Sequence, residues 1–232
     1  MMFFDPKYML FVLLPSLIIS GGASLLVRAA FSRYSRIRSR RGYTGAQAAQ
    51  LLLDRAGIHD VRVLATHGHL TDHYNPQTRE LALSEEVYSS NSLAAVGVAC
   101  HEAGHAIQHA HNYAPLGLRS ALVPAAGIGS NLGLMVMGFG LLIHPFVVGI
   151  GVLIFSAVLL FQLVTLPVEF DATARAKRLV VEAGIVDEDE RYGINRTLNA
   201  AALTYVAAVV TTLLTILYYL MRSGLLGGSR DE

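Results

Sequence analysis

Four long apolar stretches constrain the fold of this 232-residue chain more than any other feature. Each has about twenty residues with almost no charge, enough to cross the hydrocarbon core of a bilayer as a helix. Backbone N–H and C=O groups must be paired within the protein in hydrocarbon, so such segments are helical. The composition agrees, at 53% hydrophobic and 15% charged residues. We therefore expect a mainly α multi-pass membrane protein with about four transmembrane helices, at residues 8–27, 121–143, 146–166 and 200–221.

The second and third stretches are separated only by His144 and Pro145, which predicts an antiparallel transmembrane hairpin over 121–166. Ala125, Gly129 and Gly133 recur every fourth residue and would allow close helix contact. We interpret this stripe as packing, and the nearby Asn131 as interhelical hydrogen bonding rather than as part of a substrate route. A cleaved signal peptide is the alternative for 8–27. The weakly basic start and the arginines that follow favour a retained helix.

Positive charge is unevenly distributed and predicts the topology. Of the eighteen Lys and Arg residues, ten lie between 28 and 119, five between 167 and 199, and three elsewhere. Because Lys and Arg are enriched in cytoplasmic segments, both regions should face the cytoplasm, with the termini outside. The arginine-rich stretch 28–41 contains Phe31 and Tyr34, as a nucleic-acid patch might. Next to a spanning helix it is better interpreted as an anchor at anionic headgroups, so we expect no nucleic-acid partner.

Between residues 28 and 119 the pattern predicts a small α+β cytoplasmic unit. Thr44 can cap a short amphipathic helix that closes at Gly57. VRVLATHG and RELALS alternate as strands do, and HLTDHYNPQT would connect them, which predicts a two-strand element. Its edge could pair with an extended substrate. A helix capped by Ser92 should then continue until Pro115.

His101, Glu102 and His105 form an H-E-x-x-H motif on that helix. Residues four apart share a helix face, so both imidazoles can bind one zinc ion. The stretch from Leu93 to Cys100 is wholly apolar, which predicts a shielded position for the motif. Glu102 would be the general base that takes a proton from zinc-activated water. The motif therefore predicts a zincin-like metallopeptidase unit with one Zn²⁺ per chain.

A third zinc ligand is expected within 167–199, on the same side of the membrane. A helix is predicted here, with Pro167 near its start and Gly184 just beyond its end. Glu169 is the preferred ligand, which would make the site gluzincin-like. Asp171 is the main alternative, although its position better suits orienting an imidazole from behind. His109 is a further alternative.

Other residues could contribute to the site. Cys100 could be a thiolate ligand or nucleophile, but we interpret it as a buried packing residue. His59, His67, His69 and His73 could each be ligands, and we interpret His73 as a substrate or transition-state contact. The oxyanion of the transition state needs a donor. The candidates are His73, Tyr74, Arg175 and Tyr205.

The chain resembles a known family, the YugP-like bacterial membrane neutral zinc metallopeptidases. The resemblance covers nearly the whole length and rests on four segments, LTDHYNPQTRELALSEEVY (70–88), VACHEAGHAIQHA (98–110), LPVEFDATARA (166–176) and NAAALTYVAA (199–208). It implies a membrane-bound zinc peptidase with ligands His101, His105 and Glu169 and Glu102 as base. The layout is also similar to that of HtpX-type membrane peptidases, whose third ligand, a Glu, is followed four residues later by an Asp. Here Thr173 stands at that place and Asp171 two residues earlier.

These observations predict a zinc endopeptidase of the bacterial inner membrane, acting on membrane proteins or peptides near the cytoplasmic face. The expected organisation is helix 1 at 8–27, a zincin-like region at 28–119, the hairpin at 121–166, a cytoplasmic helix at 167–199, helix 4 at 200–221 and a flexible tail at 222–232. Partners would be the lipid bilayer, the substrate, and a regulatory membrane protein or a second copy of the chain. One alternative is a non-catalytic scaffold or adaptor for a partner protease. A metal-handling protein is another, but it would need ionisable residues within the spans, which are nearly absent.

Overall fold

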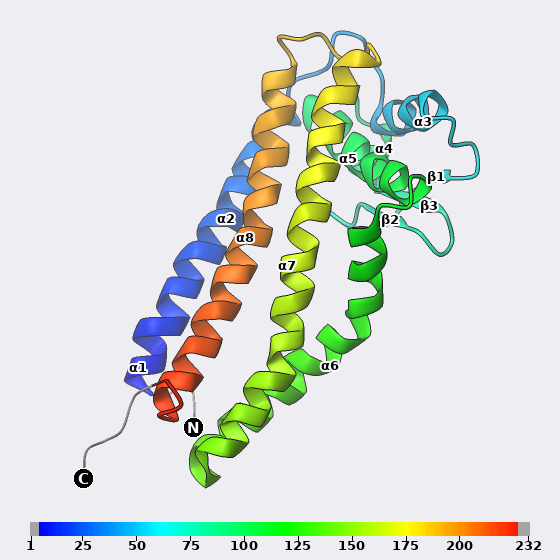
Figure 1. Ribbon diagram of the computed structural model, residues 1–232. Coiled ribbons are helices and arrows are strands. Elements are labelled where there is room, and N and C mark those ends of the chain that lie inside the picture. Colours follow the sequence, from blue (N-terminus) through cyan, green and yellow to red (C-terminus); the bar gives the residue numbers. More distant parts are fainter. Residues whose placement is uncertain (1–4, 227–232) are drawn as a thin grey trace. The chain divides into compact units, whose positions relative to one another are not determined.

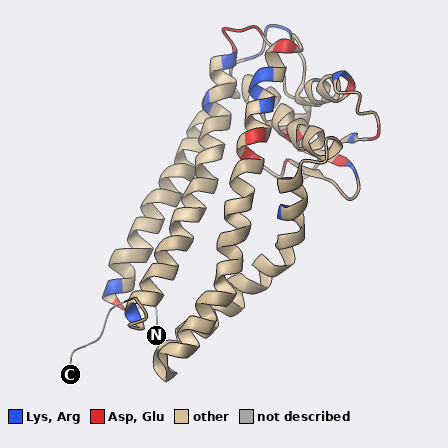
Figure 2. Ribbon diagram, in the orientation of Figure 1, with Lys and Arg blue, Asp and Glu red and all other residues tan. Residues whose placement is uncertain are grey.

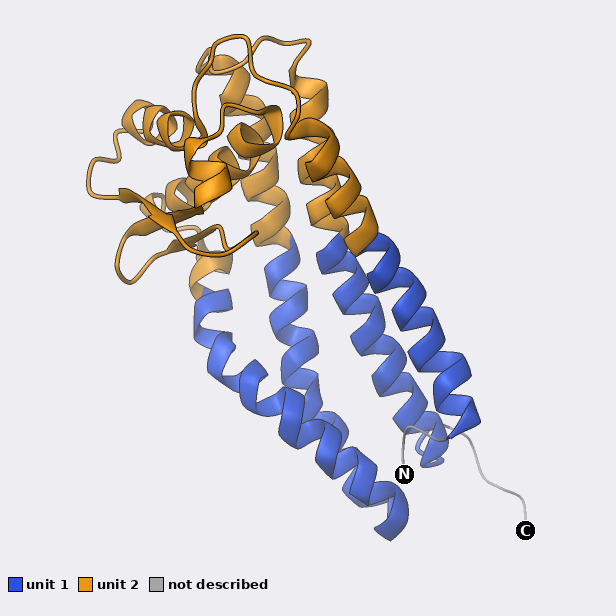
Figure 3. Cartoon of the chain, turned by 180° about the vertical axis from the view of Figure 1, so that it is seen from behind, with its two compact units in different colours: residues 1–23, 118–166, 204–232 blue, residues 24–117, 167–203 orange. Residues whose placement is uncertain are grey.

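The computed structural model describes residues 5–226, and the expected flexible tail lies outside these residues from position 227 onward. The chain forms two compact units (Figure 3). Unit 1 comprises residues 1–23, 118–166 and 204–232, and unit 2 comprises 24–117 and 167–203. Figure 1 labels the four long helices, α2 (Leu14–Tyr34), α6 (Ala114–Ile143), α7 (Pro145–Glu182) and α8 (Arg191–Arg222). Along the chain, each of them has residues in both units.

Unit 1 is helical and apolar. Before α2 the chain forms one turn of α1 (Pro6–Tyr8) and a π-helical turn, η2 (Met9–Leu13). By length and composition four helices can cross a membrane, which confirms the predicted number: Pro6–Tyr34, Ala114–Ile143, Pro145–Glu182 and Arg191–Arg222. Leu142 and Leu153 are each 75% exposed, as expected for side chains that contact lipid. The charged residues described in this unit are Asp5, Lys7, Arg119 and Arg222 (Figure 2).

Glycines bring α6 and α7 into close antiparallel contact within unit 1. A Cβ on Gly133 would lie 2.8 Å from the backbone nitrogen of Phe155, and one on Gly140 would lie 2.6 Å from that of Val148. The small-residue stripe is thus a packing surface, as predicted. One predicted member is wrong, because Ala125 is exposed and its neighbour Ala126 is buried.

Two helix boundaries differ from the prediction. We expected a new helix at Pro167, but α7 continues through this proline as one helix of 38 residues. Proline removes one backbone hydrogen bond and bends a helix without necessarily ending it. Similarly, α8 begins at Arg191, well before the apolar stretch at 200–221. Apolar length therefore located the spans but not the helix ends.

Unit 2 contains a sheet of three strands, β1 (Arg62–Thr66), β2 (His73–Asn75) and β3 (Glu80–Ser84), in the order β1-β3-β2. Both predicted strands are confirmed as β1 and β3, but the predicted number of two is wrong, because β2 adds a third strand. β3 pairs in parallel with β1 and antiparallel with β2, whose Tyr74 is opposite Leu81. We assigned β2 to the connection because three residues are too few to show an alternating pattern.

The helix that carries the metal motif, α5 (Leu93–Ala110), packs in the core of unit 2 with α3 (Gly45–Arg55). A short helix, α4 (Glu85–Ser89), lies between β3 and α5 in the chain. The predicted caps are confirmed, since Thr44 accepts from the Gln47 N–H and Ser92 from the Ala95 N–H. The helix ends earlier than Pro115. Asn112 adopts a left-handed φ of 52°, and the Tyr113 N–H donates to the Gln108 carbonyl at 3.0 Å, which is a Schellman ending.

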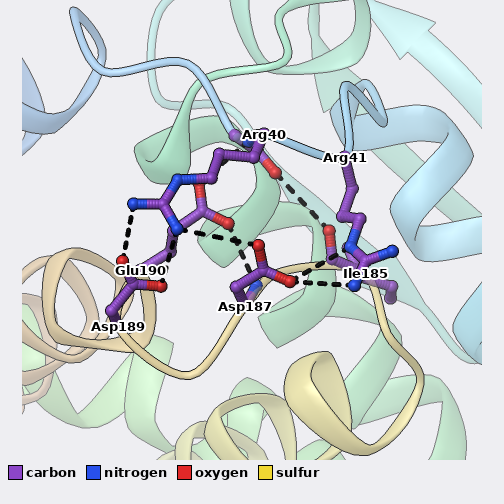
Figure 4. A network of polar contacts seen from close by, with 7 residues as sticks. Arg40, Arg41, Ile185, Asp187, Asp189 and Glu190 are labelled. Atoms are coloured by element: carbon purple, nitrogen blue, oxygen red, sulfur yellow. Dashed lines mark hydrogen bonds and ion pairs between the residues drawn. The ribbon is translucent and has the colours of Figure 1, made fainter.

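A polar network joins the segment after α2 to the turn between α7 and α8 (Figure 4). Arg40 and Arg41 form ion pairs with Asp187 and Asp189. The buried Glu190 carboxylate accepts the backbone N–H of Arg40 at 2.9 Å and that of Asp187 at 3.0 Å. Glu190 is therefore a buried hydrogen-bond acceptor, although it lies in an acidic turn. Two of the predicted headgroup-anchor arginines instead pair within the protein.

Candidate metal centre

Helices α5 and α7 bring three ligand-type side chains together in unit 2. His101 and His105 stand one turn apart on α5, and Glu169 lies on α7, two residues after Pro167. The Glu169 Oε2 atom is 3.2 Å from His101 Nε2 and 3.5 Å from His105 Nε2. Across residues 5–226 this is the one group of three such side chains that could hold a metal ion. Glu169, the residue preferred as third ligand in the sequence analysis, therefore lies beside the two histidines.

The spacing of these atoms fits zinc. Two atoms each 2.0–2.1 Å from a zinc ion at a tetrahedral angle are about 3.3 Å apart. The separations of 3.2 and 3.5 Å bracket this value. Glu169 is 1% exposed and His105 6%, so the carboxylate and one imidazole are buried, whereas the His101 side chain is 14% exposed. Two histidines and one carboxylate are also a common ligand set of catalytic zinc.

His105 is held from behind by an uncharged residue that the sequence did not suggest. Its Nδ1 atom is 2.9 Å from the Gln108 Oε1 atom, and Gln108 is fully buried. The Gln108 amide nitrogen donates to the Val168 carbonyl and to the Asp171 carboxylate, each at 2.8 Å. Asp171, predicted to orient an imidazole, therefore contacts Gln108. A usable signal was present, because Gln108 is three residues after His105 and shares its helix face.

His101 is held by Thr173, whose Oγ1 atom lies 3.3 Å from His101 Nδ1. This is the position, four residues after Glu169, at which HtpX-type peptidases have an Asp. The sequence comparison had marked the position, but it did not indicate that a threonine could serve there. Both motif histidines are therefore backed by neutral oxygen atoms.

Glu102 lies on α5 between the two histidines and is 9% exposed. Burial by itself lowers the pKa of His105, but hydrogen bonding to Glu169 and the charges of Glu102 and Glu169 outweigh it. The pKa of His105 is therefore raised above its ordinary value. Without metal the site attracts a proton, so it is electrostatically suited to a cation.

The other candidate residues are placed elsewhere. His109 is outside the cluster, and its Nδ1 atom is 2.8 Å from the Tyr74 hydroxyl. His73 is exposed, and its Nδ1 atom lies 2.8 Å from the Thr71 carbonyl oxygen. Arg175 donates from Nε to Asp171 at 2.6 Å. Tyr205 belongs to unit 1.

The remaining ligand candidates are also outside the cluster. His59, His67 and His69 lie beside exposed carboxylates, at 3.7, 2.9 and 3.0 Å respectively. Cys100 is buried, and burial raises the pKa of its thiol, so it has the properties of a packing residue.

A cavity of about 280 Å³ adjoins the motif helix in unit 2. Ala106, His109 and Ala110 of α5 line one wall, and Tyr74 of β2 lines another. Burial raises the pKa of the Tyr74 hydroxyl, which therefore remains a hydrogen-bond donor at neutral pH. The cavity is therefore lined by both β2 and α5, with polar as well as apolar side chains.

Fold and site together define a helical membrane protein with a cluster of two histidines and one glutamate that could hold a metal ion. The chain belongs to a zinc peptidase family, since residues 8–224 match the family described as "Putative neutral zinc metallopeptidase". It is 41% identical over 213 residues to a protein of Bacillus subtilis (strain 168) named "Putative membrane protease YugP", covering 91% of this chain and 95% of that protein. No solved structure matches the chain. The predicted family resemblance is confirmed.

Proposed function

We propose that the protein is a membrane-bound zinc-dependent endopeptidase that hydrolyses peptide bonds of membrane proteins or peptides near the cytoplasmic face. The observation that carries this proposal is the convergence of His101, His105 and Glu169, with Glu102 on the same helix as the two histidines. A purely structural zinc site would not need Glu102, a second buried carboxylate beside the three ligands.

The chain's residues divide into metal ligands and a proton carrier. His101 and His105 would bind one zinc ion through Nε2, and Glu169 through a carboxylate oxygen. When bound, zinc supplies Lewis acidity that polarises a carbonyl oxygen and lowers the pKa of water. Glu102 would accept a proton from the attacking water on its carboxylate and deliver it to the leaving amine nitrogen.

Substrate would bind along β2, the antiparallel edge strand of the sheet. An extended peptide can add to an exposed strand edge through main-chain hydrogen bonds, with side chains entering neighbouring pockets. The cavity beside Tyr74 and His109 is one such pocket. Of the oxyanion-donor candidates His73, Tyr74, Arg175 and Tyr205, we would test Tyr74 first, because its hydroxyl is half-buried and protonated.

The proposed orientation places unit 2 in the cytoplasm and both termini outside a bacterial inner membrane. It is supported by the concentration of Lys and Arg in residues 28–119 and 167–199. Cysteine accessibility labelling from outside the cell tests it. A cysteine introduced next to His144, between α6 and α7, should be labelled, and one introduced next to Arg79 should not.

The test of activity is Glu102→Gln in the full-length protein in nanodiscs, with a fluorescein-labelled unfolded protein as substrate. We expect zinc content equal to wild type and cleavage lower by about 10²–10⁴-fold, the usual contribution of a general base. Glu182→Gln is the control, because Glu182 is an exposed carboxylate on α7 at a distant turn. Undiminished cleavage by Glu102→Gln would contradict the mechanism. Full function of that variant in cells, without cleavage in vitro, would favour the scaffold alternative.

A further inference from the structure

We propose that Gln108 is a positioning residue of the metal centre. Its amide, locked by Val168 and Asp171, would set the tautomer and ring orientation of His105. The inference rests on the proposed function only in taking the bound ion to be zinc. Asp171 would therefore orient Gln108, which in turn orients His105, whereas the sequence analysis predicted that Asp171 orients an imidazole directly.

The orientation of the Gln108 amide follows from its partners rather than from atom labels. The two groups 2.8 Å from one end of the amide are the Val168 carbonyl and the Asp171 carboxylate. A carbonyl and a carboxylate can only accept hydrogen bonds, so the group facing both must be the NH₂. The other end, 2.9 Å from His105 Nδ1, must therefore be the carbonyl oxygen.

The tautomer of His105 follows from this orientation. An amide oxygen only accepts, so Nδ1 must carry the proton that it donates to Gln108. In the neutral ring the lone pair is then on Nε2, the atom that faces Glu169 at 3.5 Å. Nε2 is thereby the ring atom that is left to bind a metal ion.

The same amide links the two helices that carry the ligands. Gln108 is on α5, three residues after His105, and its partner Val168 immediately precedes Glu169 on α7. Asp171 is held in turn by the Arg175 Nε, which donates at 2.6 Å. Because Gln108 is fully buried, its amide depends on these protein partners rather than on solvent for its hydrogen bonds.

The first test is the zinc affinity of full-length Gln108→Leu. It would be measured in detergent by competition with a fluorescent chelator. We expect affinity about 10–100-fold below wild type, the range seen when a partner behind a metal-binding histidine is lost. The Co²⁺-substituted protein should show an altered d–d absorption band, which a merely looser fold with intact ligands would not produce. Gln50→Leu is the matched control, since Gln50 also donates to a carboxylate, at 2.9 Å, but on the exposed surface of α3.

A double-mutant cycle keeps the inference testable if Gln108→Leu does not fold. In Gln108→Glu a carboxylate would face Asp171 and the Val168 carbonyl, so zinc affinity should fall. Adding Asp171→Asn supplies an amide that can donate to Glu at position 108, and should restore at least about threefold of the loss, as expected for residues in one hydrogen-bond network.

Two results would overturn the proposal: a folded Gln108→Leu protein with zinc affinity within twofold of wild type, or a double variant no better than Gln108→Glu. Both readouts measure metal binding. They therefore remain decisive even if the wild-type protein cleaves nothing, which would instead count against the proposed function.

Discussion

Gly104 lies at the closest approach between the two helices of the metal centre, directly before His105. A Cβ added here would lie 2.9 Å from the Ala172 carbonyl oxygen, 3.3 Å from its Cα and 3.4 Å from its carbonyl carbon. All three atoms belong to the backbone of α7, so no side-chain rotation can relieve the contact. We therefore expect Gly104→Ala to push α5 and α7 apart by several tenths of an ångström, and with them His105 and Glu169.

The stability effect is the difference between two opposing contributions. Overpacking a tight interface costs about 1–3 kcal/mol. Replacing a glycine inside a helix by alanine contributes about 1 kcal/mol in the opposite direction. The net loss in the free energy of unfolding should therefore be about 0–2 kcal/mol, small enough for the protein to fold. Zinc affinity should fall by about tenfold or more, because the separations of 3.2 and 3.5 Å already match tetrahedral zinc.

Gly97→Ala on the same helix is the matched control. Its Cβ would meet the Ile194 side chain at 3.2 Å, and a side chain can shift where a backbone cannot. Zinc affinity by chelator competition and thermal unfolding of both variants would be compared in the same detergent. We expect Gly97→Ala to bind zinc as wild type does. Equal zinc affinity in Gly104→Ala and wild type would refute the argument that this contact sets the ligand spacing.

Three further predictions follow from burial and charge. Glu190→Ala should lower the free energy of unfolding by about 2–3 kcal/mol, because two backbone N–H groups lose a buried acceptor. The control is Asp189→Ala, which removes an exposed ion pair of the same network and should cost at most about 1 kcal/mol. Thermal unfolding of both variants would be compared. Cys100 should resist iodoacetamide in the folded protein and react after denaturation, since burial raises the pKa of its thiol; rapid native labelling detected by mass spectrometry would contradict this. The raised pKa of His105 stabilises the metal-free protein below the unfolded value of about 6.5, and this contribution is lost as pH rises through the folded pKa. Zinc requires the neutral ring, so the Tm difference between zinc-loaded and chelator-treated protein should increase from about pH 6 to about pH 8, and a constant difference would contradict the assignment of His105 as a ligand.

Local sequence patterns predicted the features that depend on only a few neighbouring residues. Apolar length indicated four spans because hydrocarbon allows no unpaired backbone. The i, i+4 spacing placed His101 and His105 on one face because helix geometry is invariant. The caps at Thr44 and Ser92 were predictable for the same reason, since each satisfies an N–H three residues away.

Three-dimensional contacts between distant segments decided the rest. The strand at 73–75 was missed because its pairing with β3, rather than any pattern of its own, makes it a strand. The continuation of α7 through Pro167 likewise overrode a local helix-ending signal.

The sequence by itself determined a membrane-spanning zinc peptidase family and the pair His101 and His105, because those depend on composition and on spacing along one helix, whereas the place of Glu169 on a second helix beside them was decided by the fold. Only the tertiary structure decided which groups stand behind the histidines. Gln108 and Thr173 hold these positions because α5 and α7 meet at Gly104 and Ala172. This contact brings together His101 and Glu169, which are 68 residues apart along the chain. Hydrogen-bond partners across a helix interface depend on how two backbones approach, and no spacing within one segment encodes that approach.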